Sequence, residues 1–369
     1  MIPFSISGRA RPLVWLACSM ATMASAPHAK AQSSPASQVA VYGIIDMGLE
    51  YRTHNNANGN SQWRVNSGGL NTSRLGFKGS EDLGGGLKAQ FNLESEVVVD
   101  TGATGSSFFG RQAWVGVDHK DWGGVSLGRM STVAYDFTIS HDFMGFAPQY
   151  SWVTATASVP SSAFTSRISN ALRYLGKFGA FKVGANVSLG EVPDSINANT
   201  GRGLSVGYDA GALSAQLSYD EGRTGATATA TDSTKNRSII ASGTYALGGT
   251  KLFAGVRNTH RDPVGTINAG NPKFTSTLYW LGASTPLSPA ITAFGGLYYE
   301  NKHGTGSDPL MLAGKLHYNF SKRTWLYATA AIARAPSDDS TQTLTGVYRD
   351  QTPVASHQTG LGIGIQHRF

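Results

Sequence analysis

Cysteine is almost absent from this sequence. The single cysteine among 369 residues is Cys18, close to the N-terminus. A disulfide framework and a thiolate metal site each need several cysteines, so both are excluded. Beyond residue 31 the chain also lacks any apolar run of about 18 residues, the length that a membrane-spanning helix requires. The chain is therefore neither a disulfide scaffold nor a helical membrane protein.

Charge is sparse, since Asp, Glu, Lys and Arg make up 14% of the residues and the formal net charge is +7. Without residues 1–31 the chain would lose Arg9, Arg11 and Lys30, which leaves 27 basic against 23 acidic residues. This excess of basic residues is mild. The sequence has no long basic run and no module of interleaved aromatic and basic residues like those of nucleic-acid binders, so nucleic-acid binding is not indicated. The 45 glycines, with many Ser, Thr, Asn and Tyr residues, favour strands and turns over helices.

The N-terminal segment has the features of a secretory signal peptide. Two arginines precede a short apolar core at residues 13–21, and Ala29-Lys30-Ala31 is a small-x-small cleavage site. We expect cleavage after Ala31, so residues 1–31 are predicted as signal peptide and residues 32–369 as the exported domain. Cys18 raises a lipoprotein alternative, but Trp15 stands where a lipobox needs an aliphatic residue.

Strict alternation of apolar and polar residues recurs along the exported part. At residues 87–97 the odd positions are apolar or small and the even positions are polar, as in a strand with one apolar and one wet face. The last ten residues alternate in the same way and end on Phe369. We count sixteen such segments, at residues 39–51, 72–80, 86–99, 109–119, 124–137, 167–177, 179–190, 202–210, 212–221, 236–247, 250–261, 275–286, 290–301, 310–320, 323–334 and 358–369.

Short turns alternate with long polar connections between these segments, which is typical of an outer-membrane barrel. We therefore predict an all-β, 16-stranded antiparallel transmembrane β-barrel. The last strand is expected to pair with the first, because lipid offers no hydrogen bonds to the backbone groups of an unpaired strand edge. A soluble β-sandwich is the alternative, but sixteen strands would need two sandwiches and no linker separates two halves. Aromatic residues near strand ends fit two girdles; they are Tyr42, Tyr51, Tyr279, Trp280, Tyr298, Tyr299, Trp325 and Tyr327.

Several stretches resemble the general porins of Gram-negative bacteria, in particular those of the betaproteobacterial branch. The matching stretches are VYGIIDMGLEY at residues 41–51, SRLGFKGSEDLGGGLKA at 73–89, GRQAWVGV at 110–117, LGR at 127–129 and GIQHRF at 364–369. The resemblance implies a homotrimer of barrels in the cell outer membrane, each with a water-filled pore. It also implies a third loop folded into the pore, here at about residues 138–166. Outer-membrane lipid, lipopolysaccharide, the barrel assembly machinery, and small ions and solutes are the expected partners, with Phe369 as the C-terminal assembly signal.

Porins of this family oppose acids on the inward loop to a basic cluster on the wall. Strand parity and the resemblance predict a basic wall formed by Arg74, Lys78, Arg111, Arg167 and Arg173. From residue 137 to residue 190 the only carboxylate is Asp142, which we predict as the acid of the loop. This deficit of acid predicts a positive constriction that prefers anions, with an effect that salt weakens. Four further carboxylates face the lumen and could offset it: Asp46, Glu50, Glu94 and Glu96.

Other interpretations of single residues remain open. Each arginine could instead brace the barrel through a lumen carboxylate, an interpretation that applies most to Arg129. Trp114 is expected at a subunit interface. His141 beside Asp142 is not a catalytic triad by itself, since nucleophilic catalysis needs a positioned Ser-His-Asp set. The remaining histidines lack metal-ligand spacing, so we predict no enzyme activity, catalytic residue, metal or cofactor.

The leading interpretation is thus passive diffusion of small hydrophilic solutes and ions, with a preference for anions. A substrate-specific channel for phosphate or organic acids is an alternative that would need basic and aromatic residues along the whole lumen. An adhesin-like barrel is another, and it would act only through its external loops.

Overall fold

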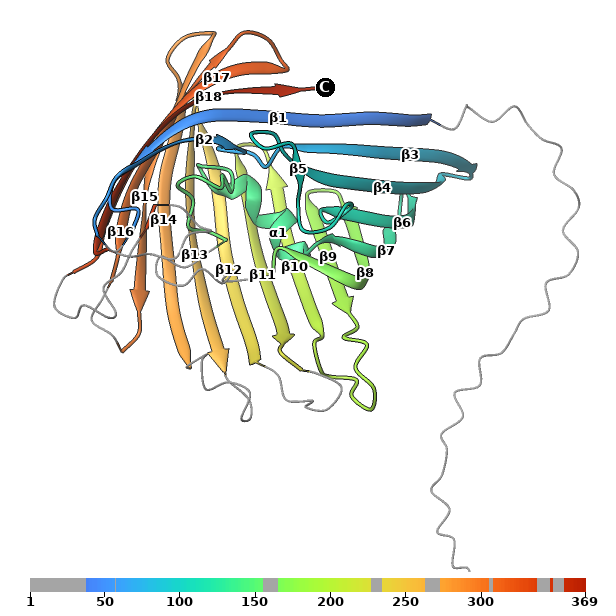
Figure 1. Ribbon diagram of the computed structural model, residues 1–369. Coiled ribbons are helices and arrows are strands. Elements are labelled where there is room, and N and C mark those ends of the chain that lie inside the picture. The colour runs from blue at the N-terminus through green and yellow to red at the C-terminus, as the bar shows by residue number, and fades with distance from the viewer. Residues whose placement is uncertain are drawn as a thin grey trace, which may run out of the picture. The chain divides into compact units, whose positions relative to one another are not determined.

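Sixteen long strands of the computed structural model form a closed antiparallel barrel (Figure 1). The structure describes residues 38–56, 58–154, 165–226, 234–262, 273–304, 308–336, 346–347 and 355–369. The predicted cleavage site after Ala31 lies outside these residues. The long strands are β1 (Gln38–Arg52), β3 (Arg74–Gly84), β4 (Leu87–Val98), β6 (Gln112–His119), β7 (Gly123–Ser131), β8 (Arg167–Phe178), β9 (Phe181–Ser188), β10 (Gly201–Ala210), β11 (Leu213–Thr224), β12 (Thr234–Leu247), β13 (Thr250–Asp262), β14 (Phe274–Pro286), β15 (Ile291–Lys302), β16 (Leu310–Asn319), β17 (Thr324–Arg334) and β18 (His357–Arg368).

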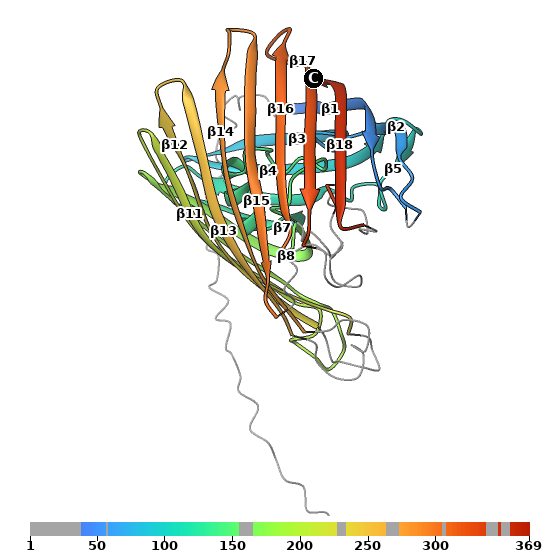
Figure 2. The same cartoon turned by 90° about the vertical axis from the view of Figure 1, so that its left-hand side faces the viewer.

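The barrel closes where β18 pairs with β1, as the sequence predicts. The register places Met47 opposite Ile365 and Leu49 opposite Ile363. Gly43 and Phe369 exchange two backbone hydrogen bonds, at 3.1 and 3.2 Å, at the end of this seam. Because every long strand then has two neighbours, the sheet has no exposed edge. Figure 2 shows the strands on either side of the seam, β18 and β1, beside β17 and β16.

Two short strands go beyond the prediction. β2 (Gln62–Ser67) pairs with the second half of β1, while β3 pairs with its first half. β5 (Ala103–Thr104) pairs with the end of β4. Both lie in connections that the sequence predicts as loops. β2 pairs with the part of β1 that lies beyond the end of β3, and β5 pairs with the part of β4 that lies beyond its pairing with β6.

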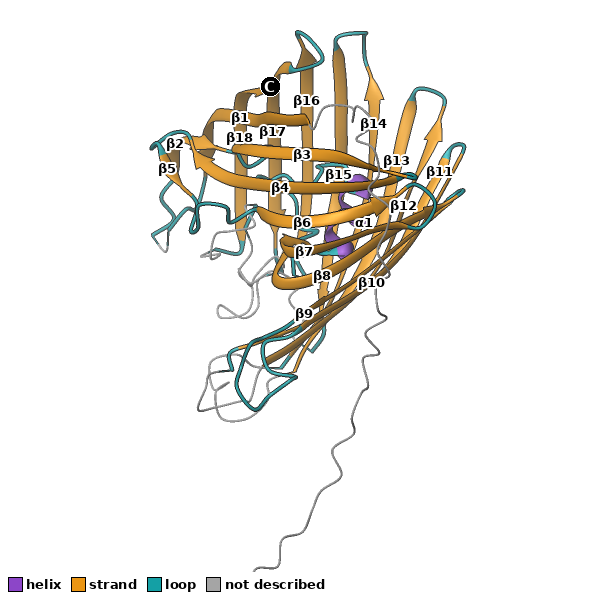
Figure 3. Cartoon of the chain, turned by 90° about the vertical axis from the view of Figure 1, so that its right-hand side faces the viewer, coloured by secondary structure: helices purple, strands orange, loops and turns teal. Residues whose placement is uncertain are grey.

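The predicted strand at residues 124–137 is wrong at its end. β7 stops at Ser131, and α1 (Val133–Thr138) and the 3₁₀ turn η1 (Ile139–His141) follow. The Thr132 hydroxyl accepts a hydrogen bond from Tyr135 N at 3.2 Å, which caps the helix. The alternating letters of this segment resemble a strand, but the cap and the packing of the helix inside the barrel override that pattern (Figure 3). No helix formed by the described residues is long and apolar enough to cross a membrane.

The prediction of aromatic girdles is correct for only some of the aromatic residues named for it. Tyr279 is exposed, whereas its neighbour Trp280 is buried; Tyr298 is likewise buried and Trp325 packs against the inner cluster. Adjacent residues of a strand point to opposite faces, so two consecutive aromatics cannot both meet lipid. Trp280 and Tyr298, the inward members of two such pairs, instead donate hydrogen bonds to the segment that follows β7.

Candidate functional site

The segment from Thr132 to Thr154 is fastened to the inner wall of the barrel. On one side, Trp280 Nε1 donates to the carbonyl of His141 at 2.9 Å, and Lys315 Nζ donates to that of Met144 at 2.9 Å. On the other side, Gln149 N donates to the carbonyl of Gly69 at 3.1 Å. These contacts come from β14, β16 and the β2–β3 connection, so the segment is held from several directions.

Asp142 organises the turn in the middle of this segment. Its carboxylate accepts hydrogen bonds from Phe146 N at 2.8 Å, the Ser151 hydroxyl at 2.7 Å and the Tyr298 hydroxyl at 2.5 Å. The carboxylate is therefore satisfied by local donors and by the wall. The predicted loop acid shapes the loop and does not project from it.

Apolar side chains of the segment are buried against the wall, as their composition suggests. They form one cluster with wall residues, whose members include Phe143, Met144, Phe146, Tyr150, Trp152, Leu278, Trp280 and Tyr298. Burial of large side chains in a close-packed cluster favours one arrangement of the segment. The part of the predicted loop at residues 155–164 lies outside the described residues.

Three of the predicted arginines converge on the wall opposite α1. Arg111 Nε donates to Glu94 Oε1 at 2.6 Å, and Arg74 Nη1 lies 3.8 Å from the same oxygen. Arg167 Nε donates to the carbonyl of Arg111 at 3.1 Å, and its guanidinium lies 6.0 Å from the ring centroid of Tyr135 on α1. Arg74 and Arg111 thus share one carboxylate, and Arg167 joins them through the backbone of Arg111.

A cavity of about 290 Å³ separates this cluster from the loop segment. Arg74, Arg111 and Arg167 line it on the wall side, and Tyr135 and Asp136 on the loop side. Asp136 forms an ion pair with Arg173, with Nη1 2.8 Å from Oδ2. Burial raises the pKa of Asp136, and the Arg173 guanidinium opposes that rise. Glu94 and Arg173 do not line the cavity, but they contact residues that do; with them included, four arginines accompany two carboxylates, a formal excess of two positive charges.

Sequence reasoning missed two residues of this cavity. Asp136 falls in the segment that is predicted as strand, so the loop carries two carboxylates and its acid deficit is smaller than expected. Arg368 also lines the cavity, and it shares strand parity with the inward Gln366, a signal that is present in the sequence. Arg368 adds to the positive charge, so the cavity stays positive although the loop is more acidic than predicted.

The other predicted basic residues have different surroundings. Lys78 is exposed on the inner face of β3, 5.1 Å from the ring centroid of Tyr42, and it does not line this cavity. Arg129 donates to the carbonyl of Gly110 at 2.6 Å and to the Ser169 hydroxyl at 2.7 Å. These two partners differ from the lumen carboxylate that a purely bracing role would use.

Trp114 packs on an inner cluster of Met130, Ile168 and Ala171. It therefore does not lie on the outer face, where a subunit interface is expected.

The four predicted lumen acids do not contribute equally to the charge of the lumen. Asp46 is fully buried and accepts hydrogen bonds from Leu70 N, Asn71 N, Tyr327 and Gln366 at 2.6–3.1 Å, which ties the β1–β18 seam together. Glu50 is also buried, with Arg64 Nε at 2.5 Å and Arg52 Nε at 3.4 Å. Because these two carboxylates already have partners, they offset the arginine cluster little.

Glu94 is the shared partner of the arginine cluster, so it belongs to the site itself. Glu96 is partly buried opposite Arg74 in the β3–β4 register. It is therefore a neighbour of the cluster with no ion pair to it among the described residues.

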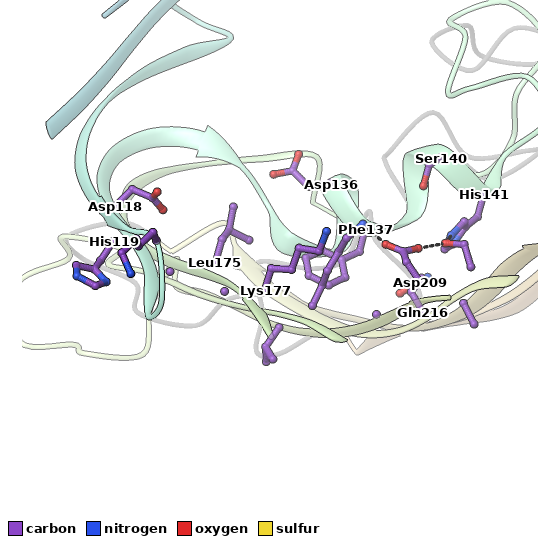
Figure 4. A pocket seen from close by; sticks show the side chains of 18 residues that line it. Asp118, His119, Asp136, Phe137, Ser140, His141, Leu175, Lys177, Asp209 and Gln216 are labelled. Carbon is purple, nitrogen blue, oxygen red and sulfur yellow. Dashed lines mark hydrogen bonds and ion pairs between the residues drawn. The ribbon is translucent and has the colours of Figure 1, made fainter. Parts of the chain in front are cut away.

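A second cavity, of about 390 Å³, lies on another side of α1 (Figure 4). Its lining contains three carboxylates and three lysines: Asp118, Asp136, Asp209, Lys120, Lys177 and Lys182. Lys182 and Asp209 form an ion pair. Because these charges cancel, the second cavity has no reason to sort ions by sign.

His141 lines the second cavity and does not form a triad. Its ring is hydrogen-bonded to the Ser242 hydroxyl at 3.0 Å and the Ser214 hydroxyl at 2.9 Å, and Ser214 donates to Asp209. Burial and nearby Lys251 lower the pKa of His141 to about 4. The ring is uncharged at neutral pH, and the carboxylate contacts a serine and not the histidine, which is not the order that nucleophilic catalysis needs.

This chain is similar to outer-membrane porins in both sequence and structure. The family model described as Gram-negative porin matches residues 17–337. Outer membrane porin protein 32 of Delftia acidovorans is 32% identical, over 95% of this chain and 98% of that protein. Another outer membrane porin protein, from Bordetella pertussis, is 28% identical, over 90% of this chain and 94% of that protein. Among solved structures, the anion-selective porin from Comamonas acidovorans has a TM-score of 0.75 and 28% identity, covering 90% of this chain and 100% of that one.

Proposed function

Because this chain belongs to the Gram-negative porin family, we propose that this outer-membrane porin passes small hydrophilic anions in preference to cations. The observation that carries the proposal is the cavity between α1 and the wall, which Arg74, Arg111 and Arg167 line and where Glu94 is the carboxylate partner of the first two. A wide pore leaves ions hydrated, so the sign of the charge at its narrowest part decides which ions enter. The similar structure from Comamonas acidovorans is that of an anion-selective porin, which supports the same sign.

We assign the narrowest part of the pore to the gap between the Thr132–Thr154 segment and the basic wall. Arg74, Arg111 and Arg167 act as the selectivity cluster, and Arg173 holds α1 through Asp136. Lys78 adds positive charge on the same strand as Arg74. Arginine suits this role because its guanidinium stays charged beside other cations.

The proposal extends to assembly. We infer a homotrimer, export after cleavage of residues 1–31, contact with outer-membrane lipid and lipopolysaccharide, and insertion by the barrel assembly machinery. Phe369 acts in this proposal as the assembly signal. Its position at the seam, with two backbone bonds to Gly43, supports a role in closing the barrel.

The test is the reversal potential of the purified protein in a planar bilayer under a salt gradient. We expect a potential of the sign that anion flow produces, and its loss when Arg74, Arg111 and Arg167 are all replaced by glutamine. A potential of the cation sign would overturn the selectivity proposal, because lumen carboxylates would then outweigh the arginines. Conductance with no ion preference in the wild-type protein would overturn it as well.

A further inference from the structure

The second cavity, of about 390 Å³, lies at the end of the barrel where short turns join the strands. Its wall residues come from the ends of β6, β8, β9, β10 and β11. The short connections at 120–122, 179–180 and 211–212 join strands at this end. In an outer-membrane barrel the short turns are periplasmic. The cavity therefore lies on the periplasmic side of the inward segment, and solutes pass it after the basic wall.

Most charges that line this cavity are already paired. Ion pairs account for four of its six charged lining residues: Lys182 with Asp209, Asp136 with Arg173, and Lys120 with Asp121. Asp118 and Lys177 are the other two, and neither has an ion-pair partner within the part of the chain that the structure describes. Lys88 is opposite Asp118 in the β4–β6 register without forming such a pair. One carboxylate and one ammonium group are thus left for a ligand.

The register places these two groups on opposite sides of Leu175. Asp118 is opposite Gly124 on β7, and Gly124 is opposite Leu175 on β8. Lys177 follows Leu175 on the same face of β8, so the backbones of Asp118 and Lys177 lie roughly 12 Å apart by strand spacing and rise. The lysine stem spans part of that distance. Figure 4 shows Asp118, Leu175 and Lys177 around the cavity, where a small molecule fits between the two charges.

Two glycines leave space for this arrangement. A Cβ on Gly124 would stand 2.6 Å from Asp118 Oδ1, so any other residue there would displace the carboxylate. A Cβ on Gly184 would stand 3.0 Å from Phe137 Cε2 and 3.1 Å from Leu175 Cδ2. Phe137 of α1 and Leu175 therefore lie directly on the backbone of β9. They give the cavity an apolar surface beside its two unpaired charges.

We propose that this cavity binds a zwitterionic amino acid with an apolar side chain. Asp118 holds the ammonium group, Lys177 holds the carboxylate, and Phe137 and Leu175 contact the side chain. A simple anion or cation meets only one of the two charges and is repelled by the other, whereas a zwitterion meets both. Two contacts within one molecule reinforce each other, because the first raises the effective concentration for the second. The porin then binds a solute without net charge, which goes beyond anion preference at the basic wall.

The test measures the dissociation constant of isotope-labelled L-leucine for the folded, detergent-purified porin, by ligand line broadening in NMR at low salt. Lys177→Gln and Asp118→Asn should each bind leucine about fivefold more weakly, since one partly exposed ionic contact contributes about that factor. Leucine methyl ester keeps the ammonium group and lacks the carboxylate. It should bind the wild type more weakly than leucine does, and Lys177→Gln should not weaken its binding further.

Lys322→Gln, at an exposed turn outside the lumen, is the control and should bind leucine as the wild type does. The proposal is overturned if the wild type does not bind leucine, if both single variants keep wild-type affinity, or if the ester binds the wild type as tightly as leucine. The double variant with Asp118→Asn and Lys177→Gln keeps the net charge of the cavity. It should lose leucine binding and keep the reversal potential of the wild type, so failure here is separable from failure of the selectivity proposal.

Discussion

Replacement of Arg74 by glutamine removes one of the excess positive charges at the constriction while leaving its surroundings in place. Arg74 Nε donates to the carbonyl of Thr72 at 3.0 Å, a bond that a glutamine amide can also make. Its carboxylate contact at 3.8 Å is the longer of the two at Glu94, which keeps Arg111 at 2.6 Å. The change should therefore alter the charge of the constriction more than its shape.

The size of the effect follows from electrostatics. One unit charge about 5 Å from a hydrated ion in water changes the energy of that ion by about 0.8 kcal/mol. Since the charge attracts anions and repels cations, its loss changes their ratio by about twice that energy, or about 15-fold. Screening at 0.1 M salt, where the Debye length is about 10 Å, reduces the change to about fivefold. At 1 M salt, with a Debye length of about 3 Å, it should be less than about twofold.

The assay is the reversal potential in planar bilayers at several mean salt concentrations. Lys322→Gln, at an exposed turn outside the lumen, is the matched control and should leave the potential unchanged. Glu94→Gln should move the potential toward stronger anion preference, because it removes the carboxylate that the arginines share. A potential that is the same for Arg74→Gln and wild type at 0.1 M, or a change that persists undiminished at 1 M, would refute the reasoning.

Three further predictions concern the loop and the assembly of the barrel. The pKa of His141 is about 4 in the folded protein and about 6.5 in an unfolded chain, so the folded form binds fewer protons in between, and stability should fall as pH drops through this window. His141→Gln should therefore show a smaller loss of melting temperature between about pH 7 and pH 5 than the wild type. Tyr298→Phe removes the 2.5 Å bond to Asp142 and should lower the free energy of unfolding by about 1.5–3 kcal/mol, measured by denaturant titration. Phe369→Ala should lower the amount of folded porin in outer-membrane fractions.

Each of these has a result that would contradict it. Equal acid sensitivity of His141→Gln and wild type would mean that the histidine is not responsible for the pH dependence. Tyr299→Phe, the outward neighbour of Tyr298, is the control for the loop, and equal losses from both variants would argue against a specific role of the Asp142 contact. Phe320→Ala removes an exposed aromatic from a turn, and an equal loss from it would show that Phe369 has no special role in assembly.

Much of the barrel could be predicted because strand periodicity is a local property. The predicted ends of β1, β13 and β17 lie within one residue of those observed, since alternation along each strand must match lipid on one side and polar contacts on the other. The prediction fails at residues 132–137, where alternation continues but a threonine cap and packing against the wall make a helix. The site shows the same division. Arg74 and Arg111 could be chosen by parity and by resemblance, whereas the pairing of Arg173 with Asp136 depends on where that helix lies.

The sequence by itself determined the class of the protein, the number of its long strands and the inward parity of most of the basic wall, because each of these follows from a repeat of two residues and from the hydrogen bonds that lipid cannot supply. Only the tertiary structure decided which charges cancel. Asp46 and Glu50 face inward by parity, yet their carboxylates are already bound by hydrogen-bond and ion-pair partners from distant strands and connections. Arg74, Arg111 and Arg167 line a single cavity because pairing of neighbouring strands from β3 to β8, together with the inward segment, brings three separate parts of the sequence together. The net charge of the cavity depends on distances between residues far apart in the chain, which periodicity does not encode.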